Sequence, residues 1–275
     1  MNPADVTVLC YHRISRWPLP AGTWVGPGQL ARQLDVLLEA GVRFISPADY
    51  HHLITAPVLC GEDPTPFPAS TPQVLVTFDD GTVDIHCHRE ILAGRGIRPL
   101  VFMPSAFLGR QNSWEWPIPG RRIRHLCGDQ LRELAAAGWE IGLHGASHCD
   151  LTRLAVDRLT PEIAEARAEL QEAVGRPVRF FSYPFGRAAP PVASRIQAEG
   201  FTAAFILAAH GPVQGKIDLF HLARRPVYCI DSPADVLAKV MDPTGRTGYG
   251  RWQHWKERAA HGVGRWTAGR LLVRH

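Results

Sequence analysis

The chain has 275 residues, of which 45% are hydrophobic and 20% are charged, and its formal net charge is +4. This composition is typical of a soluble globular protein, and it excludes a disordered, collagen-like or disulfide-dense chain. The length is near the upper limit for one hydrophobic core, so we expect one main domain, residues 1–241, followed by a basic tail, residues 242–275.

Apolar, β-branched runs recur along the chain with helical patterns between them. Leu30, Leu34, Leu37 and Leu38 form one face of a predicted helix that stops at Gly41. Later helices are predicted before Gly138 and after Thr160. Strands are predicted at residues 6–11, 74–78, 99–103, 139–143, 178–183, 203–207 and 219–228. Such a repeated βα pattern gives a parallel sheet, either open or closed as a barrel, with its chemistry at the carboxyl ends of the strands.

One segment departs from the pattern. Residues 56–72 contain five prolines, and proline disrupts both helices and central strands. We therefore expect a long surface loop there, without a catalytic role.

The second predicted strand ends in two adjacent acids, Asp79 and Asp80, followed by Gly81. Neighbouring side chains on a strand point to opposite faces, so both acids reach one pocket only if the chain turns there, which a glycine makes easy. Adjacent carboxylates repel each other unless a cation neutralises one of them. The alternative is a structural role, in which one aspartate caps the following helix.

Two histidines favour the functional interpretation. His144 and His148 directly follow the predicted strand 139–143, and one turn of helix would place both rings on the same side. Two imidazoles and a carboxylate, with a fourth position open to water, form the usual hydrolytic zinc site. A surface pair of histidines is the alternative, but the matched positions at two strand ends argue for a metal site.

From about residue 6 to residue 240, the chain resembles the polysaccharide deacetylases, carbohydrate esterase family four with the NodB-homology fold. Residues 77–81, Thr-Phe-Asp-Asp-Gly, match the family's first motif, and residues 144–148, His-Gly-Ala-Ser-His, resemble its second. Residues 181–186, Phe-Ser-Tyr-Pro-Phe-Gly, resemble the third, in the branch whose members have an early Tyr-His-Arg, here residues 11–13. The resemblance implies a distorted, incomplete (β/α)7-type barrel.

The resemblance also implies roles for individual residues. Asp79 is expected to be the general base, and Asp80, His144 and His148 are expected to hold one divalent metal ion. Zinc is the default for these ligands, while Co²⁺, Ni²⁺, Mn²⁺ and Fe²⁺ also suit them. A backbone N–H near Tyr183 is expected to stabilise the oxyanion.

Two assignments stay open at this point. The general acid is expected to be His221, which lies in a Leu-x-His pattern, or His12, which follows the first strand. The family often has an arginine two residues before the proline of its third motif, where this chain has Ser182. We hypothesise that Arg224 supplies this positive charge to Asp79 from the neighbouring strand.

Other residues are candidates for contacts with a substrate. Tyr183, Pro184 and Phe185 belong to the third motif, and Trp114 and Trp116 lie in a predicted loop. Aromatic rings above a barrel mouth can stack on a sugar, although ordinary packing is an equal alternative for the two tryptophans.

The positive charge is concentrated near the C-terminus. From residue 246 onwards, six arginines and one lysine face one glutamate, a net charge of +6. We favour packing of the tail's aromatic residues on the domain over contact with a membrane surface, because they form no clean apolar stripe. No nucleic-acid recognition motif accompanies the charge, and the oligomeric state is not predicted.

The remaining features predict the compartment. The sequence shows no export signal and no run of eighteen apolar residues, and its six cysteines are scattered singly. We therefore expect a cytoplasmic protein with free thiols.

These observations together predict a metal-dependent N-deacetylase that acts on a small, N-acetylated amino-sugar substrate. The first alternative is an amidase or deformylase with a non-sugar or formamido substrate, because the fold and ligands leave the acyl group open. The second is a carbohydrate-binding protein with a decayed site, which the intact aspartates and histidines argue against.

Overall fold

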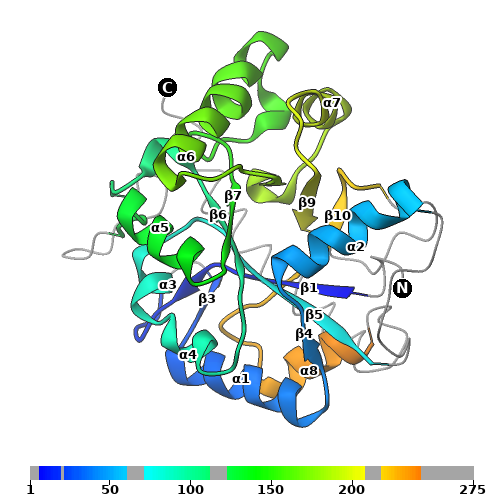
Figure 1. Cartoon of the computed structure of the whole chain (residues 1–275). Coiled ribbons are helices and arrows are strands. Elements are labelled where there is room, and N and C mark those ends of the chain that lie inside the picture. Colours follow the sequence, from blue (N-terminus) through cyan, green and yellow to red (C-terminus); the bar gives the residue numbers. More distant parts are fainter. Residues whose placement is uncertain (1–5, 20–21, 61–70, 112–122, 208–217, 243–275) are drawn as a thin grey trace.

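The computed structural model of the chain describes residues 6–19, 22–60, 71–111, 123–207 and 218–242 (Figure 1). Parallel strands form a closed ring, because the sheet order β1-β10-β9-β8-β7-β6-β5 is completed by pairing of β1 with β5. The ring strands are β1 (Val6–Tyr11), β5 (Gln73–Phe78), β6 (Leu100–Met103), β7 (Glu140–Leu143), β8 (Phe180–Ser182), β9 (Ala203–Leu207) and β10 (Leu222–Pro226). The predicted barrel is therefore confirmed, with every predicted strand contributing to it.

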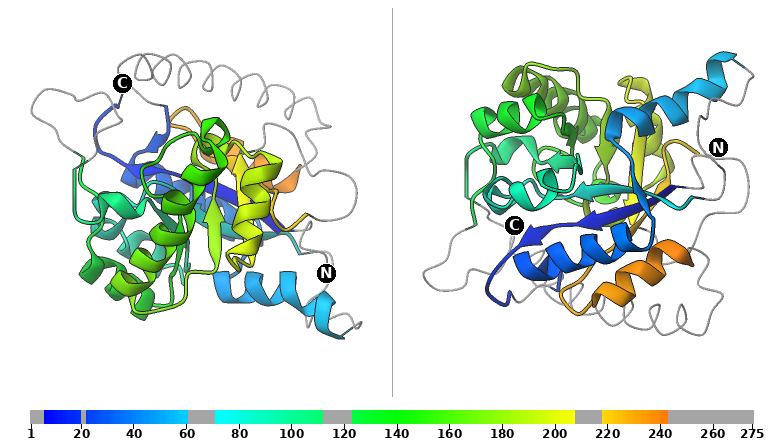
Figure 2. Two further views of the ribbon diagram at one scale, coloured as in Figure 1. Left: turned by 90° about the horizontal axis from the view of Figure 1, so that it is seen from above. Right: turned by 60° about the horizontal axis from the view of Figure 1, so that its bottom comes forward.

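Helices surround the ring, and three further short strands of the described residues lie outside it. On the underside, α1 and α8 lie side by side (Figure 2, right). The helices are α1 (Pro27–Glu39), α2 (Pro47–Cys60), α3 (Val83–Cys87), α4 (Glu90–Ala93), α5 (Gly128–Ala136), α6 (Ala166–Val174), α7 (Pro190–Ala198) and α8 (Pro233–Met241). The additional strands are β4 (Arg43–Phe44), which extends from β5, and the pair β2 (Arg13–Ile14) and β3 (Trp24–Val25).

Helix α1 illustrates how the apolar pattern determines the packing. Leu30, Leu34 and Leu37 are fully buried, as the spacing of the leucines predicts, whereas Leu38, predicted on the same face, is 41% exposed. Burying a leucine side chain stabilises a fold by about 1.5–3 kcal/mol. This face attaches the helix to the outside of the barrel.

Helix α2 corrects one prediction. The helix continues to Cys60 and therefore includes Pro57, although the sequence predicted a loop from Ala56 onwards. Proline removes one helical hydrogen bond and disfavours the helix interior without excluding it. The rest of the predicted loop, apart from residues 71 and 72, lies outside the described residues.

Successive side chains of the ring strands point to opposite faces and therefore belong to two separate hydrophobic clusters. Leu75 of β5 packs with Phe102, Phe180 and Phe205 in one cluster, while Val74, Val76 and Phe78 belong to the other. Because successive side chains of a strand point to opposite faces, Thr77 and Asp79 continue the face that Leu75 begins. The end of β5 thus directs Asp79 toward the aromatic inner cluster.

Within the described part of the chain, no helix is both long enough and apolar enough to cross a membrane. The boundary predicted at residue 241 is not tested, because the tail from residue 243 lies outside the description.

Candidate functional site

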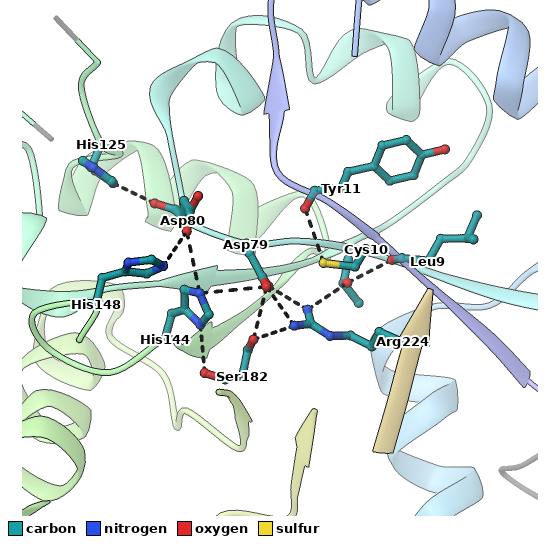
Figure 3. Close-up of polar contacts among 11 residues, drawn as sticks. Leu9, Cys10, Tyr11, Asp79, Asp80, His125, His144, His148, Ser182 and Arg224 are labelled. Carbon is teal, nitrogen blue, oxygen red and sulfur yellow. Dashed lines mark hydrogen bonds and ion pairs between the residues drawn. The ribbon is translucent and has the colours of Figure 1, made fainter. Parts of the chain in front are cut away.

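The two adjacent aspartates lie in a sharp turn after β5. Asp80 has a φ of 67° and Gly81 a φ of 54°, so the chain already turns at Asp80 rather than only at the glycine. A Cβ atom on Gly81 would lie 2.4 Å from the sulfur of Met103, so a larger residue would displace that side chain, and the positive φ also favours glycine. Both carboxylates are buried, and they point to one cluster of polar side chains (Figure 3).

The two histidines meet through a loop. Residues 144–148 contain no helical turn, so the turn of helix predicted there is wrong. His148 has a φ of 57°, which an α-helix does not allow. The loop is held by Glu162, whose carboxylate accepts hydrogen bonds from the N–H groups of Ala146 and Ser147, both at 3.0 Å. The His144 and His148 rings end with their centroids 5.0 Å apart.

Asp80 and the two histidines form a group with the dimensions of a metal site. The Oδ1 atom of Asp80 lies 3.2 Å from Nε2 of His148 and 3.6 Å from Nε2 of His144. In a tetrahedral site with bonds of about 2.1 Å, ligand atoms lie roughly 3.4 Å apart. This Oδ1 is buried and has no hydrogen bond within the described residues. The three ligands therefore fit a divalent cation.

The His144 ring is held in the form that a metal requires. Its Nδ1 lies 2.8 Å from the carbonyl oxygen of Ser182, and a carbonyl only accepts hydrogen bonds, so Nδ1 carries the hydrogen. Nε2 is then left with its lone pair facing Asp80. Burial lowers the pKa of His144 to about 4, against the raising effect of the nearby aspartates. The ring is therefore neutral at pH 7.

Asp79 is bound by a buried arginine. The two terminal nitrogens of Arg224 donate to the two Asp79 oxygens at 2.6 and 2.8 Å. Arg224 also donates to the Ser182 hydroxyl at 2.7 Å, and this hydroxyl donates to Asp79 at 3.3 Å. The strand order places β9 between β8 and β10, so the arginine reaches Asp79 from two strands away from Ser182. Arg224 therefore contacts Asp79 as hypothesised, but it does not come from the strand next to that of Ser182.

These contacts keep both carboxylates ionised. Burial acts to raise the pKa of Asp79, but Arg224 and His144 outweigh it and lower this pKa to about 2. Burial acts in the same direction on Asp80, yet the contact with His148 and the charges of nearby histidines hold its pKa well below the usual range. Asp79 can therefore accept a proton, and Asp80 can bind a cation.

Backbone strain is concentrated in this cluster. Within the described residues, the non-glycine residues with positive φ are Asp80, His148 and Phe185. Left-handed conformations cost roughly 1–2 kcal/mol for ordinary residues and persist where the surroundings enforce them, often at functional sites. Asp80 and His148 belong to the candidate metal site, and the centroid of the Phe185 ring lies 4.9 Å from that of the His148 ring.

The two general-acid candidates lie in different places. His12 directly follows β1, and a ring nitrogen of His12, a carboxylate oxygen of Asp79 and the Cys10 sulfur all lie within 4.8 Å of one another. His221 precedes the first residue of β10, at the amino end of the strand, where its ring contacts Asp218 at 2.7 Å. The structure therefore brings His12 to the cluster and places His221 at the other end of its strand.

The group formed by Cys10, His12 and Asp79 is less suited to a metal. Both oxygens of Asp79 are already occupied by Arg224, whose positive charge opposes a second cation. Burial raises the pKa of the Cys10 thiol well above its ordinary value, so the thiolate that a metal prefers is disfavoured.

The third motif forms a short turn, η6 (Pro184–Gly186). The Tyr183 side chain is fully buried and donates to the Phe220 carbonyl, so its hydroxyl is not available to a substrate. Its backbone N–H donates to the Phe205 carbonyl, that of Gly186 donates to Tyr183, and Pro184 has none. Phe185 is 43% exposed, and its N–H has no hydrogen bond within the described part of the chain. Trp114 and Trp116 lie outside the described residues.

Two residues that support the site, Glu162 and His125, have no recognisable signal in the sequence. Glu162 was only one acid near a predicted helix start, and nothing in its spacing linked it to the loop at residues 144–148. His125 lies in a segment without a helix or strand pattern, yet it contacts the Asp80 carbonyl. Such contacts depend on the tertiary fold, and only an alignment of related sequences could have indicated them.

Comparisons with known proteins show which family the chain is similar to. A family model described as polysaccharide deacetylase matches residues 68–204. The protein YxkH of Bacillus subtilis (strain 168), named as a polysaccharide deacetylase, is 26% identical over 189 residues, or 68% of this chain and 58% of that protein. The chain thus spans less than two thirds of that relative's length.

Solved structures share the fold. The structure of IcaB from Ammonifex degensii has a TM-score of 0.70 at 26% identity and covers 85% of this chain and 95% of that one. The Streptococcus pyogenes deacetylase PplD, solved in complex with acetate, has a TM-score of 0.69 at 20% identity and covers 86% and 98%.

The closed ring of parallel strands, with paired aspartates and paired histidines at their carboxyl ends, defines a barrel of the NodB-homology type. The family match and the relatives make the resemblance specific: the chain is similar to the polysaccharide deacetylases, whose family model matches residues 68–204.

Proposed function

We propose that this protein is a metal-dependent N-deacetylase that hydrolyses the acetamide group of an N-acetylated amino sugar. The observation that carries the proposal is that two adjacent carboxylates have different partners. Asp79 is paired with Arg224, while Asp80 faces the Nε2 atoms of His144 and His148. One carboxylate is thus equipped to accept a proton and the other to bind a cation.

The metal ligands in this proposal are Asp80, His144 and His148. Two imidazoles and a carboxylate suit zinc, and the same set also binds cobalt, nickel, manganese or iron. When bound, the ion supplies Lewis-acid activation of water and of the amide carbonyl.

The residues around the metal position complete the reaction. Asp79 accepts the proton of the attacking water, and its bidentate contact with Arg224 fixes the direction of its oxygens. The N–H of Phe185 is our candidate donor to the oxyanion, since the neighbouring N–H groups are already used within the fold. Acetate and a free amine are the products.

The departing amine needs a proton, and His12 is the better candidate to donate it, because it lies beside Asp79. We expect His12→Gln to lower kcat about 10²-fold on an acetamide substrate. On an acetate ester of nitrophenol, which leaves without protonation, the loss should shrink to a few-fold. Steady-state kinetics with the two substrates measure the difference.

His221→Gln provides the matched control and should keep nearly full activity on both substrates. The reverse result, with a large loss for His221→Gln and none for His12→Gln, would transfer the role to His221.

The substrate class rests on the family. A panel of N-acetylated sugars, formamides and simple amides would test it: release of acetate from an amino sugar supports the proposal, whereas turnover of non-sugar amides alone favours a general amidase. The family relatives leave the particular sugar open.

Metal analysis tests the proposal most directly. We expect the purified protein to contain about one equivalent of a transition metal and the Asp80→Ala, His144→Ala double variant to contain none. The measurement is elemental analysis, repeated after incubation with zinc and desalting. Absence of metal from both proteins after incubation would exclude the mechanism and favour a binding role.

A further inference from the structure

A short segment before α5 runs alongside the turn that carries Asp80. The Val83 N–H donates to the Arg124 carbonyl at 2.9 Å, and the Leu126 N–H donates to the Gly81 carbonyl at 2.8 Å. Between these two bonds, His125 and Thr82 form an isolated antiparallel bridge. The segment therefore holds the turn that follows Asp80 by backbone bonds at Gly81 and Val83, on either side of Thr82.

The His125 side chain adds a bond to Asp80 itself. Its Nδ1 lies 2.7 Å from the Asp80 carbonyl oxygen (Figure 3). Because a carbonyl oxygen only accepts, the imidazole must donate through Nδ1–H. The ring is only 2% exposed and packs against Phe107, with the centroids 5.4 Å apart, so it has little freedom to move away.

The bond acts on a residue whose backbone is strained. The left-handed conformation of Asp80, with a φ of 67°, directs its carboxylate toward His148 at 3.2 Å. Such a conformation persists only where neighbouring groups enforce it. A donor on the Asp80 carbonyl fixes the peptide plane that follows this residue, and hence the direction of the side chain.

We propose that His125 is a positioning residue for the metal site: by donating to the Asp80 carbonyl, it holds the Asp80 carboxylate toward His144 and His148. This inference rests on the proposed metal function. Partners that orient metal ligands typically contribute 10–100-fold to metal affinity. The remaining interpretation is that His125 merely fills space beneath the turn.

Two substitutions of similar polarity separate these interpretations. In His125→Asn the amide nitrogen occupies nearly the position of Nδ1 and can still donate to Asp80. In His125→Gln the longer chain places its amide nearer the position of Nε2, beyond the Asp80 carbonyl. His125→Phe keeps the ring volume and removes the donor.

The experiment measures zinc affinity by competition with a chromogenic chelator, and the visible spectrum of the Co²⁺-substituted protein. We expect His125→Gln and His125→Phe to bind zinc about 10–100-fold more weakly with an altered Co²⁺ spectrum, and His125→Asn to stay within about threefold of the wild type. Unfolding midpoints of the metal-free proteins establish that each variant folds. If His125→Phe does not fold, the comparison of His125→Asn with His125→Gln still tests the positioning role.

Each other outcome argues against the proposal in a recognisable way. Wild-type affinity in a folded His125→Gln variant would overturn the positioning role and leave the metal site intact. Equal losses in the Asn and Gln variants would assign the effect to ring packing. Failure of the wild type to bind zinc would overturn the proposed function itself, and this inference with it.

Discussion

Replacing Asp79 by asparagine should lower kcat by about 10²–10⁴-fold, because the amide cannot take a proton from water. The change keeps the size of the side chain, and the remaining oxygen can still accept from Arg224 and Ser182 in the position of Asp79 Oδ2. Zinc affinity should stay within a few-fold, because Asp79 is not one of the three proposed ligands. Deacetylation kinetics and the chelator competition on the same preparation measure both quantities.

A matched control exists elsewhere on the chain. Asp35 forms a similar two-pronged contact with Arg95, at 2.7 and 2.8 Å, on the outside of the barrel. Asp35→Asn should leave kcat unchanged. If Asp79→Asn retained wild-type turnover with metal bound, Asp79 would not be the base, and the roles of the two adjacent aspartates would need to be reassigned.

Replacing Arg224 by methionine should reduce both stability and activity. Both partners are buried, and removal of one partner from a buried ion pair costs about 3–5 kcal/mol, because the remaining charge is uncompensated. The free energy of unfolding from urea titration measures this loss. The Asp79→Asn, Arg224→Met double variant removes both charges and should recover part of it.

The same variant should change the pH dependence. In the wild type, Arg224 helps to hold the pKa of Asp79 at about 2, below its value in an unfolded chain. The resulting stability is present above about pH 4 and is lost as the pH falls toward 2. Without Arg224, burial dominates and raises this pKa, so the stability difference between the two proteins should widen from pH 2 upward.

The pH at which kcat/KM falls on the acid side should follow the pKa of Asp79. In Arg224→Met it should move to higher pH, because a larger fraction of Asp79 is then protonated at a given pH. If the limb and kcat were unchanged while Asp79→Asn abolished turnover, Arg224 would have only a structural role.

The strands and the residues at their ends were predictable from local signals. Val6–Tyr11 and Gln73–Phe78 are short apolar runs with turn residues after them, and parallel strands bring their carboxyl ends together. The convergence of Asp79, Asp80, His144 and His148 followed from this rule without knowledge of the loops.

Other features depended on contacts that no local pattern encodes. The path of residues 144–148 is set by the Glu162 carboxylate and by a strained His148, so a helical turn was the wrong expectation. The position of His221 at the amino end of β10 depended on where the strand begins, and the Leu-x-His pattern could not fix that boundary. Helix α2 continued through Pro57 in spite of its propensity.

The closure of the ring has a consequence for synthesis of the chain. Strand β1 pairs with β10, and Asp79 meets Arg224 across 145 positions of sequence. Contacts so distant in sequence form slowly, because a long loop must be closed first. On the ribosome, Asp79 therefore remains without its arginine until the last ring strand has emerged, and the barrel is an open sheet with unpaired edges until then. The active site is thus completed in the same late step that removes these aggregation-prone edges.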